Sequence, residues 1–256
     1  MSAESVVAAI RSSSLSEVAW VAAGGRPEVR GALTLIRGEA PVLAFSYAEE
    51  GVARDLARAR TVALALTETR STGRRFAPLL LRGRPRLTED PAGEVFSEEL
   101  LDQELLRFPP ARAYADSALL RRENWWYLPR LLVEIGLDSA QPTTSRSSPD
   151  DHVLVVARGA EPDVHVATLT ERSGSSLTLD LQCHDAPAGD AVLFGQDASF
   201  PDLEQWSQWR FRGRWEGGRF AVEEEPARTG LAKPLTLLGR WRREREFARR
   251  CRAAIP

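Results

Sequence analysis

The sequence contains few of the residues that metal, redox and covalent-amine sites need. Its 256 residues include two cysteines and three histidines, and only one of its 34 basic residues is a lysine, Lys233. Cys183 and Cys251 are far apart, and no histidine pair has helical ligand spacing, so we expect neither a disulfide scaffold nor a metal site. With a single lysine, Schiff-base and lysine-base chemistry has almost no candidate residue.

Long hydrophobic runs are also missing. No stretch approaches the length of about 18 apolar residues that spans a membrane. Glu4 and Arg11 interrupt the N-terminal segment, so no signal peptide is predicted and the expected location is cytoplasmic, with no membrane partner. The formal net charge of −2 disfavours a nucleic-acid partner, since phosphate contacts need a basic excess.

Short apolar runs separated by glycine and proline turns predict a chain of strands in the first half. The expected strands span 17–23, 27–37, 41–47, 61–69, 76–88 and 125–135. The apolar period changes to that of a helix over 51–60, and further helices are expected over 3–14, 91–107 and 111–122. Because strands and helices do not alternate, the pattern excludes a Rossmann fold.

A polar segment rich in Ser, Thr, Pro and Asp, residues 138–151, is the best candidate for a linker. We therefore predict one domain over 1–140, a linker over 141–151, and a second domain over 152–256 that ends in a helix. Strand patterns resume in the second domain over 153–158, 162–171, 176–182, 191–196, 204–215 and 219–224.

The two halves carry similar short motifs in the same order. Pro27-Glu28-Val29-Arg30 corresponds to Pro162-Asp163-Val164-His165, and Arg82-Gly83-Arg84 corresponds to Arg212-Gly213-Arg214. This order predicts a diverged internal duplication; the alternative is that two β-rich halves share strand-and-turn texture by chance. In the second copy, residues 186–190 replace the helix of 51–60. The predicted fold class is mainly β with helical insertions (α+β), with two barrel-like domains packed as a pseudo-dimer.

Four motifs of the first half, Gly25-Arg26-Pro27, Phe45-Ser46-Tyr47, Arg54-Asp55-Leu56 and Val62-Ala63-Leu64, follow a known pattern. Over residues 15–137 the chain resembles the FMN-binding split barrels related to pyridoxamine 5′-phosphate oxidase. The resemblance implies two split barrels with FMN between them and an oxidoreductase acting on a small molecule. It also implies a phosphate held at strand ends and at the start of the following helix, where free N–H groups favour an anion.

The resemblance implies that six residues contact the cofactor: Arg30, Thr34, Ser46, Tyr47, Arg54 and Trp126. Arg30, Ser46 and Tyr47 would lie near the phosphate or the ribityl chain, Thr34 near the flavin edge, and Trp126 over the ring. No catalytic residue is predicted.

The chain departs from the family pattern close to this expected site. Arg54 would add a contact to the phosphate, but two residues earlier, where the family often has a lysine or arginine, the chain has Val52. This departure keeps open a cofactor-free split barrel with a binding or structural role.

Residues 104–137 also resemble, more weakly, the haem-utilisation and haem-degrading split barrels, through Pro109, Pro110, Ala113, Tyr114 and Asp116. Haem binding or breakdown is therefore a third interpretation, and the deazaflavin F420 is an alternative cofactor. In each case the expected partner is a small molecule, and the chain would be a monomeric pseudo-dimer or a homodimer.

Two aromatic or basic segments have further interpretations. Trp209, Phe211 and Trp215 alternate along one expected strand and therefore share a face, which is predicted to be core or interface, with a ligand-stacking platform as the alternative. The arginine-rich segment 234–254 is expected to be a docked helix with a solvated basic face; contact with an anionic surface or a nucleic acid is the alternative.

Overall fold

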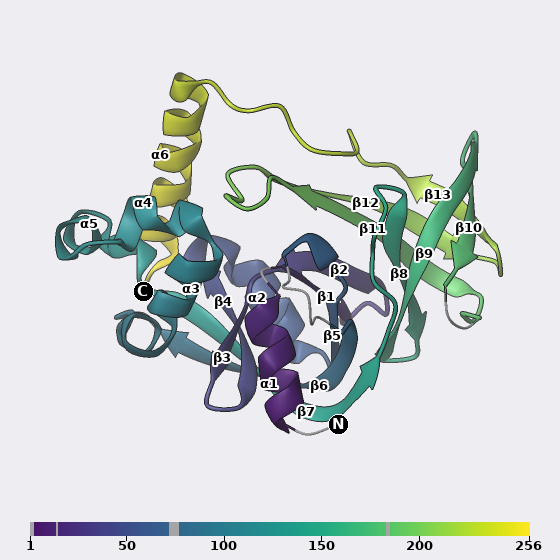
Figure 1. Ribbon diagram of the computed structural model, residues 1–256, viewed down its shortest axis with the longest axis horizontal. Coiled ribbons are helices and arrows are strands. Elements are labelled where there is room, and N and C mark those ends of the chain that lie inside the picture. Colours follow the sequence, from purple (N-terminus) through teal and green to yellow (C-terminus); the bar gives the residue numbers. More distant parts are fainter. Residues whose placement is uncertain (1–2, 14, 72–76, 183–184) are drawn as a thin grey trace.

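The computed structural model describes residues 3–13, 15–71, 77–182 and 185–256, and it is mainly β (Figure 1). Cys183, expected to be a strand residue, and His184 lie outside the described residues. The described part divides into a first half (residues 3–142) and a second half (residues 151–224), joined by residues 143–150. A C-terminal helix follows.

The first half is a seven-stranded antiparallel sheet in the order β2-β1-β5-β6-β7-β4-β3. Its strands are β1 (Ser16–Val21), β2 (Pro27–Ala32), β3 (Thr34–Arg37), β4 (Ala40–Ser46), β5 (Val62–Leu66), β6 (Leu79–Asp90) and β7 (Arg130–Pro142). Alternate residues such as Leu43 and Phe45 point to the inner core, because successive strand residues face opposite sides of a sheet. Val42 and Ala44, at the alternate positions, belong to a second apolar cluster on the outer face.

Helices cover parts of the first sheet. They are α1 (Ala3–Ser12), α2 (Glu50–Arg58), α3 (Leu101–Arg107), α4 (Arg112–Ala115) and α5 (Ala118–Glu123). Short 3₁₀ turns precede α2, at Tyr47–Glu49, and β7, at Trp125–Tyr127. Helix α2 packs Ala53 and Leu56 into the inner core and leaves its arginines outside, as the change of period predicts.

The second half is a closed six-stranded barrel in the order β10-β13-β12-β11-β8-β9. Its strands are β8 (Asp151–Arg158), β9 (Glu161–Ser173), β10 (Ser176–Leu181), β11 (Gly189–Ala198), β12 (Trp206–Trp215) and β13 (Arg219–Glu224). Trp209, Phe211 and Trp215 lie together in its core, which confirms that they share a buried face.

The two halves have one strand-pairing scheme. Strand β1 pairs with β2 and β5, β5 with β6, and β6 with β7; likewise β8 pairs with β9 and β11, β11 with β12, and β12 with β13. The register of the paired strands is also the same in both halves. Trp20 of β1 pairs with Val62 of β5, and the equivalent residue Val156 of β8 pairs with Ala191 of β11. Two β-domains of one kind in one chain are therefore present, as an internal duplication predicts.

A bulge repeats at the same place in both halves. The register shifts between Arg82 and Gly83 on β6, and between Arg212 and Gly213 on β12. At each glycine the neighbouring strand comes so close that a Cβ atom would lie 2.4 Å from the Gly136 carbonyl oxygen in the first half and 1.9 Å from the Ala221 carbonyl oxygen in the second. Conserved bulges bend a strand and re-aim its side chains, so the repeated Arg-Gly-Arg motif marks a shared structural device.

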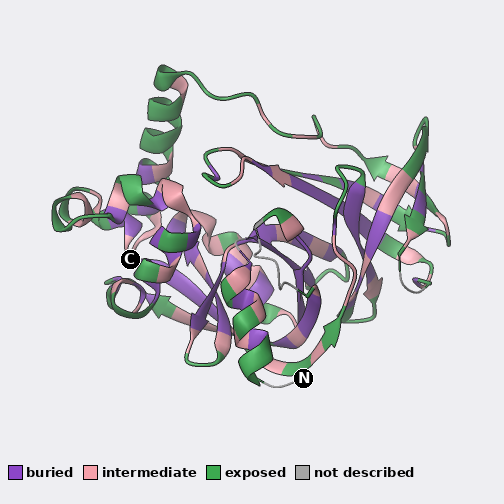
Figure 2. Ribbon diagram, viewed as in Figure 1, coloured by how far each residue is buried: buried purple, intermediate pink, exposed green. Residues whose placement is uncertain are grey.

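The halves pack against each other through matching surfaces. Buried apolar residues of both halves form one cluster, among them Ala19, Ala63, Val155, Val192 and Phe194 (Figures 1 and 2). This cluster makes the described part of the chain an intramolecular pseudo-dimer.

The polar contacts around this cluster are reciprocal. Arg82 donates to the Pro162 carbonyl oxygen at 2.7 Å and lies 3.6 Å from Asp163. Arg212 in turn donates to the Pro27 carbonyl oxygen at 3.5 Å and to Glu28 at 2.7 Å. Such exchange of equivalent contacts is the signature of a two-fold interface.

The C-terminal helix α6 (Leu237–Ala254) belongs in space with the first half. An extended segment carries the chain back from the second barrel, and α6 then stands on the first half (Figure 1). Ala248 and Cys251 are buried there, Phe247 meets Trp126 edge-on at 5.6 Å, and Arg250 donates to the Ala48 carbonyl oxygen. The end of α6 nearest the extended segment is exposed (Figure 2).

One strand differs from its prediction. Strand β7 begins at Arg130, not at residue 125, and extends to Pro142 into the expected linker. Pro129 has no N–H group to join the sheet, and Trp126 and Tyr127 are buried instead among the helices on the outer face. Trp126 is therefore not a strand residue.

Within the described part of the chain, no helix is both long and apolar enough to cross a membrane.

Candidate functional site

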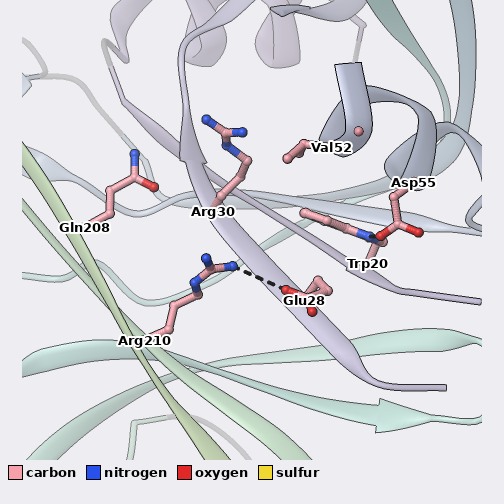
Figure 3. A pocket seen from close by; sticks show the side chains of 8 residues that line it. Trp20, Glu28, Arg30, Val52, Asp55, Gln208 and Arg210 are labelled. Atoms are coloured by element: carbon pink, nitrogen blue, oxygen red, sulfur yellow. Dashed lines mark hydrogen bonds and ion pairs between the residues drawn. The ribbon is translucent and has the colours of Figure 1, made fainter. Parts of the chain in front are cut away.

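A cleft of about 500 Å³ opens between the two halves, where the first turn of α2 faces β12 (Figure 3). The first half supplies Trp20, Glu28 and Arg30 from β1 and β2 together with Gly51, Val52 and Asp55 from α2, and the second half supplies Gln208 and Arg210. Clefts at domain interfaces are common small-molecule sites, and this one needs both halves.

Strand parity explains why β12 contributes to the cleft. Trp209 and Phe211 point into the second barrel, so Gln208 and Arg210 must point outward, toward the first half. Gln208 is held there by two hydrogen bonds: its Oε1 accepts from the Gly31 N–H at 3.0 Å, and its Nε2 donates to the Gly31 carbonyl oxygen at 3.3 Å.

Gly31 allows the halves to approach this closely. A Cβ atom at this position would lie 2.1 Å from Gln196 Oε1 and 2.8 to 2.9 Å from the side chains of Trp206 and Gln208. A glycine here is required by packing rather than by a turn, and it sets the separation of the two walls of the cleft.

Arg30 lies at the side of the cleft formed by the first half. Its Nη2 donates to Glu49 at 2.6 Å, and its guanidinium lies 5.3 Å from the centre of the Phe45 ring. Its Nε is buried and has no hydrogen-bond partner among the described residues. Because a buried N–H without a partner costs free energy, Arg30 retains the capacity to donate to a further acceptor.

Arg210 faces Arg30 from the second half, and it is only weakly neutralised. Its Nη1 is 3.3 Å from Glu28, a carboxylate that Arg212 holds more closely at 2.7 Å (Figure 3 shows the Arg210 contact). Burial lowers the pKa of Arg210, and the like charges of Arg212 and Arg30 lower it further against the opposing effect of Glu28. An anion in the cleft would relieve this repulsion.

The remaining wall is formed by α2 and β1. Trp20 donates from its indole nitrogen to Asp55 at 2.8 Å, so this carboxylate is already engaged. Val52 lies in the cleft at the position where the family resemblance leads one to expect a basic residue, and a Cβ at the neighbouring Gly51 would meet nothing within 4 Å. The first turn of α2 is thus open to a ligand.

Of the six residues predicted to contact a cofactor, Arg30 lines the cleft. Thr34 is buried, and its hydroxyl is 2.6 Å from the Ser16 hydroxyl. Ser46 is also buried and donates to Glu49 at 3.2 Å. These two hydroxyls are engaged within the first half.

The other three predicted residues lie elsewhere on the first half. The Tyr47 side chain is buried, and its hydroxyl has no hydrogen-bond partner among the described residues. Burial is the main cause that raises the pKa of the Tyr47 hydroxyl, and the negative charges of Glu89 and Asp90 raise this pKa further. Arg54 forms partly exposed ion pairs with Glu50 and Glu89. Trp126 is buried in the cluster beneath α6. Arg30 and Ser46 thus share Glu49 as a partner, whereas Thr34, Arg54 and Trp126 make their contacts elsewhere on the first half.

Five residues that line the cleft are not among the site residues predicted from the sequence: Trp20, Glu28, Asp55, Gln208 and Arg210. A usable signal existed on β12, because residues that alternate with the buried Trp209 and Phe211 have to face outward. The strand pattern does not show, however, that Gln208 and Arg210 face the first half.

Neither a protein-family model nor a curated protein matches the chain. Similar solved structures include a conserved hypothetical protein from Mycobacterium tuberculosis, with 16% identity and a TM-score of 0.43 over 56% of this chain and 84% of that one. They also include a putative pyridoxamine 5′-phosphate oxidase from Listeria innocua, with 12% identity and a TM-score of 0.36 over 56% of this chain and 98% of that one.

The haem storage protein HutZ from Vibrio cholerae is a further similar structure, with 17% identity and a TM-score of 0.38 over 57% of this chain and 98% of that one. The structural neighbours thus include oxidase-like split barrels and haem-utilisation proteins, at low identity. The function of the cleft therefore has to come from its own residues.

The histidines, the free cysteine and the acidic residues are the candidates for a metal or nucleophile site. These contain no group of three or more His, Cys, Asp or Glu side chains placed to hold a metal ion. His165 is 3.4 Å from Asp163 and does not line the cleft. Burial raises the pKa of the Cys251 thiol, which suits a core residue rather than a nucleophile.

Proposed function

We propose that the cleft between the two halves binds a small molecule carrying a phosphate group, and that FMN is the ligand to test first. The observation that carries the proposal is the pair Arg30 and Arg210, one from each half, facing one cleft beside the first turn of α2. Guanidinium groups donate to phosphate in a fixed fork geometry, and the N–H groups of a first helical turn favour an anion.

The residues present fit a phosphate at this end of the cleft. The partly exposed guanidinium of Arg30 and the weakly neutralised guanidinium of Arg210 are the available donors. The carboxylates of Glu28 and Asp55 are held by Arg212 and Trp20, respectively. Trp20 and Val52 supply apolar surface next to the charged end.

FMN, when bound, would supply electron- or hydride-transfer chemistry. The chain's own contribution in this proposal is to bind and orient. Arg30 and Arg210 would hold the phosphate between the halves, while Gly31 and Gln208 keep the two walls at a fixed separation. Such pre-organisation improves affinity because little has to be ordered on binding.

A titration of FMN fluorescence tests the proposal with one variant and a matched control. Arg210→Gln should weaken FMN binding by about tenfold or more, because a hydrogen bond to a charged group contributes about 1.5–3 kcal/mol. Arg214→Gln, four residues further along β12, should leave the affinity unchanged, since Arg214 is exposed, pairs with Asp190 and does not line the cleft.

Riboflavin, which lacks the phosphate, provides the second comparison. Its affinity should be the same for the unmodified chain and for Arg210→Gln. Equal losses of FMN affinity in Arg210→Gln and Arg214→Gln, or a loss of riboflavin affinity as large as that of FMN, would contradict a phosphate site at Arg210.

A further inference from the structure

A second cavity, of about 380 Å³, lies at one end of the second barrel. Its inner wall is apolar and aromatic, formed by Leu169, Trp209 and Phe211 together with the ring of His152. Arg172 lies at its edge, and Thr229 and Gly230 of the extended segment that leads to α6 line it from outside the barrel. The ends of β-barrels are frequent sites for small ligands.

The aromatic wall is held in place by its neighbours. Trp209 packs closely against Gly195, where a Cβ atom would come within 2.3 to 2.5 Å of the indole ring. The indole N–H donates to His152 Nε2 at 3.3 Å, and His152 Nδ1 is 2.8 Å from the Asp150 carbonyl oxygen. Burial lowers the pKa of His152, so the imidazole is neutral and both its nitrogens are engaged.

The corresponding end of the first half is filled. Ser16 and His152 occupy equivalent register positions, since Ser16 pairs with Ala32 as His152 pairs with Ala167. Helix α1 leads into β1 at Ser16, and its residues Val6 and Ile10 are buried in the core of the first half. No helix enters the second barrel at β8, where residues 143–150 take the place of α1. A position that is core in one copy is a cavity in the other.

The three arginines that line this cavity differ in how far carboxylates neutralise them. Arg146 is buried and satisfied by Glu17 and Glu68, and Arg70 is held by Glu68 and Asp197. Arg172 is half-exposed, its guanidinium lies 5.9 Å from the centre of the Phe211 ring, and its ion pair is with the exposed Glu225. An exposed pair of this kind is weak, so Arg172 is the cation that a ligand can recruit.

We propose that this end of the second barrel is a binding site for a small aromatic acid, with the apolar body against Trp209, Phe211 and Leu169 and the acid group at Arg172. The site is separate from the cleft at Arg30 and Arg210 and takes a different ligand. It exists because the second copy of the domain has no counterpart of α1.

The probe for the test is 8-anilinonaphthalene-1-sulfonate, an aromatic sulfonate, with N-phenyl-1-naphthylamine as its uncharged analogue. The full chain should bind one equivalent of the sulfonate saturably, and saturating FMN should not displace it. Leu169→Trp, which fills the cavity, should weaken both probes by about tenfold or more, since a filled pocket loses the apolar contact. Trp241→Ala, which removes an exposed aromatic of α6, should change neither.

Arg172→Gln separates the acid group from the apolar body. It should weaken the sulfonate by about fivefold, as expected for loss of a charge-assisted hydrogen bond, and leave the uncharged analogue unchanged. Arg219→Gln, an exposed arginine of β13 outside the cavity, is the matched control. If Leu169→Trp does not fold, the comparison of Arg172→Gln with Arg219→Gln tests the proposal by itself.

Two results would overturn the proposal. One is unchanged sulfonate affinity in a folded Leu169→Trp chain, judged by its near-ultraviolet circular dichroism. The other is a sulfonate affinity that is the same in Arg172→Gln and Arg219→Gln. Displacement by FMN would assign the probe to the cleft and would also contradict a separate site.

Discussion

Replacing Arg146 by methionine is expected to lower the free energy of unfolding by about 3–5 kcal/mol, because it leaves buried carboxylates without their cation. Arg146 lies on the segment between the halves, and its side chain is buried. Its Nη2 donates to Glu17 at 2.8 Å and approaches Glu68 at 3.4 Å. Urea denaturation at neutral pH measures the loss.

This arginine is the centre of a network that spans both halves. Its Nε donates to Thr67 at 3.1 Å and its Nη1 to the Gln196 carbonyl oxygen at 3.3 Å. Gln196, on β11 of the second half, also donates from its side chain to Glu17 at 2.7 Å. A fully satisfied buried network rigidifies the structure around it, and a broken one is costly.

The matched control and the pH dependence separate this effect from general damage. Arg84→Met removes the exposed pair with Asp138 and should cost less than about 1 kcal/mol. Burial already raises the pKa of Glu17 against the opposing charge of Arg146. Without Arg146 this pKa should rise further.

An acid whose pKa is higher in the folded than in the unfolded state binds more protons when folded. The Arg146→Met chain should therefore regain stability, relative to the unmodified chain, as the pH falls below neutral. A loss no larger than that of Arg84→Met, or a deficit that does not shrink with falling pH, would contradict this role for Arg146.

Replacing either bulge glycine by alanine is expected to have the second large effect on stability. Gly213→Ala and Gly83→Ala should each lower the free energy of unfolding by about 2–3 kcal/mol, the upper part of the range for overpacked sites. The added Cβ would meet a backbone carbonyl oxygen, at 1.9 Å for Gly213 and 2.4 Å for Gly83. A backbone carbonyl cannot move aside as the end of a flexible side chain can. Because the distance is shorter at Gly213, Gly213→Ala should lower the free energy of unfolding more than Gly83→Ala.

Gly136→Ala is the control for these variants. Gly136 lies on β7 opposite the bulge, and a Cβ there would come no closer than 3.7 Å to the Arg84 carbonyl oxygen. Its effect should stay below about 1 kcal/mol. If Gly136→Ala costs as much as the two bulge variants, close backbone approach at the bulges is not the cause.

Much of the fold could be predicted from local pattern. Turn glycines and alternating apolar residues locate the strands, and the repeated Arg-Gly-Arg motif falls on the same bulge in both halves. The burial of Trp209, Phe211 and Trp215 follows from their parity alone. These features depend on neighbours in sequence or on one strand.

The candidate site depended on contacts that local pattern does not contain. Arg30 lines the cleft, but its pairing with Glu49 depends on how the 3₁₀ turn at Tyr47–Glu49 meets β2. Arg210 reaches the cleft only because the halves pack with β12 beside β2. The burial of Trp126 likewise depends on α6, which returns to the first half from the far end of the chain.

Binding stoichiometry tests the central claim most directly, namely that two equivalent halves share a single phosphate-binding cleft. Among the described residues, only the first half places a helix such as α2 beside the cleft, and the position equivalent to Arg30 in the second half is His165. Calorimetric titration of the full chain should therefore give one FMN per chain, lost or strongly weakened in Arg210→Gln. Two equivalents per chain, or no saturable binding, would contradict it.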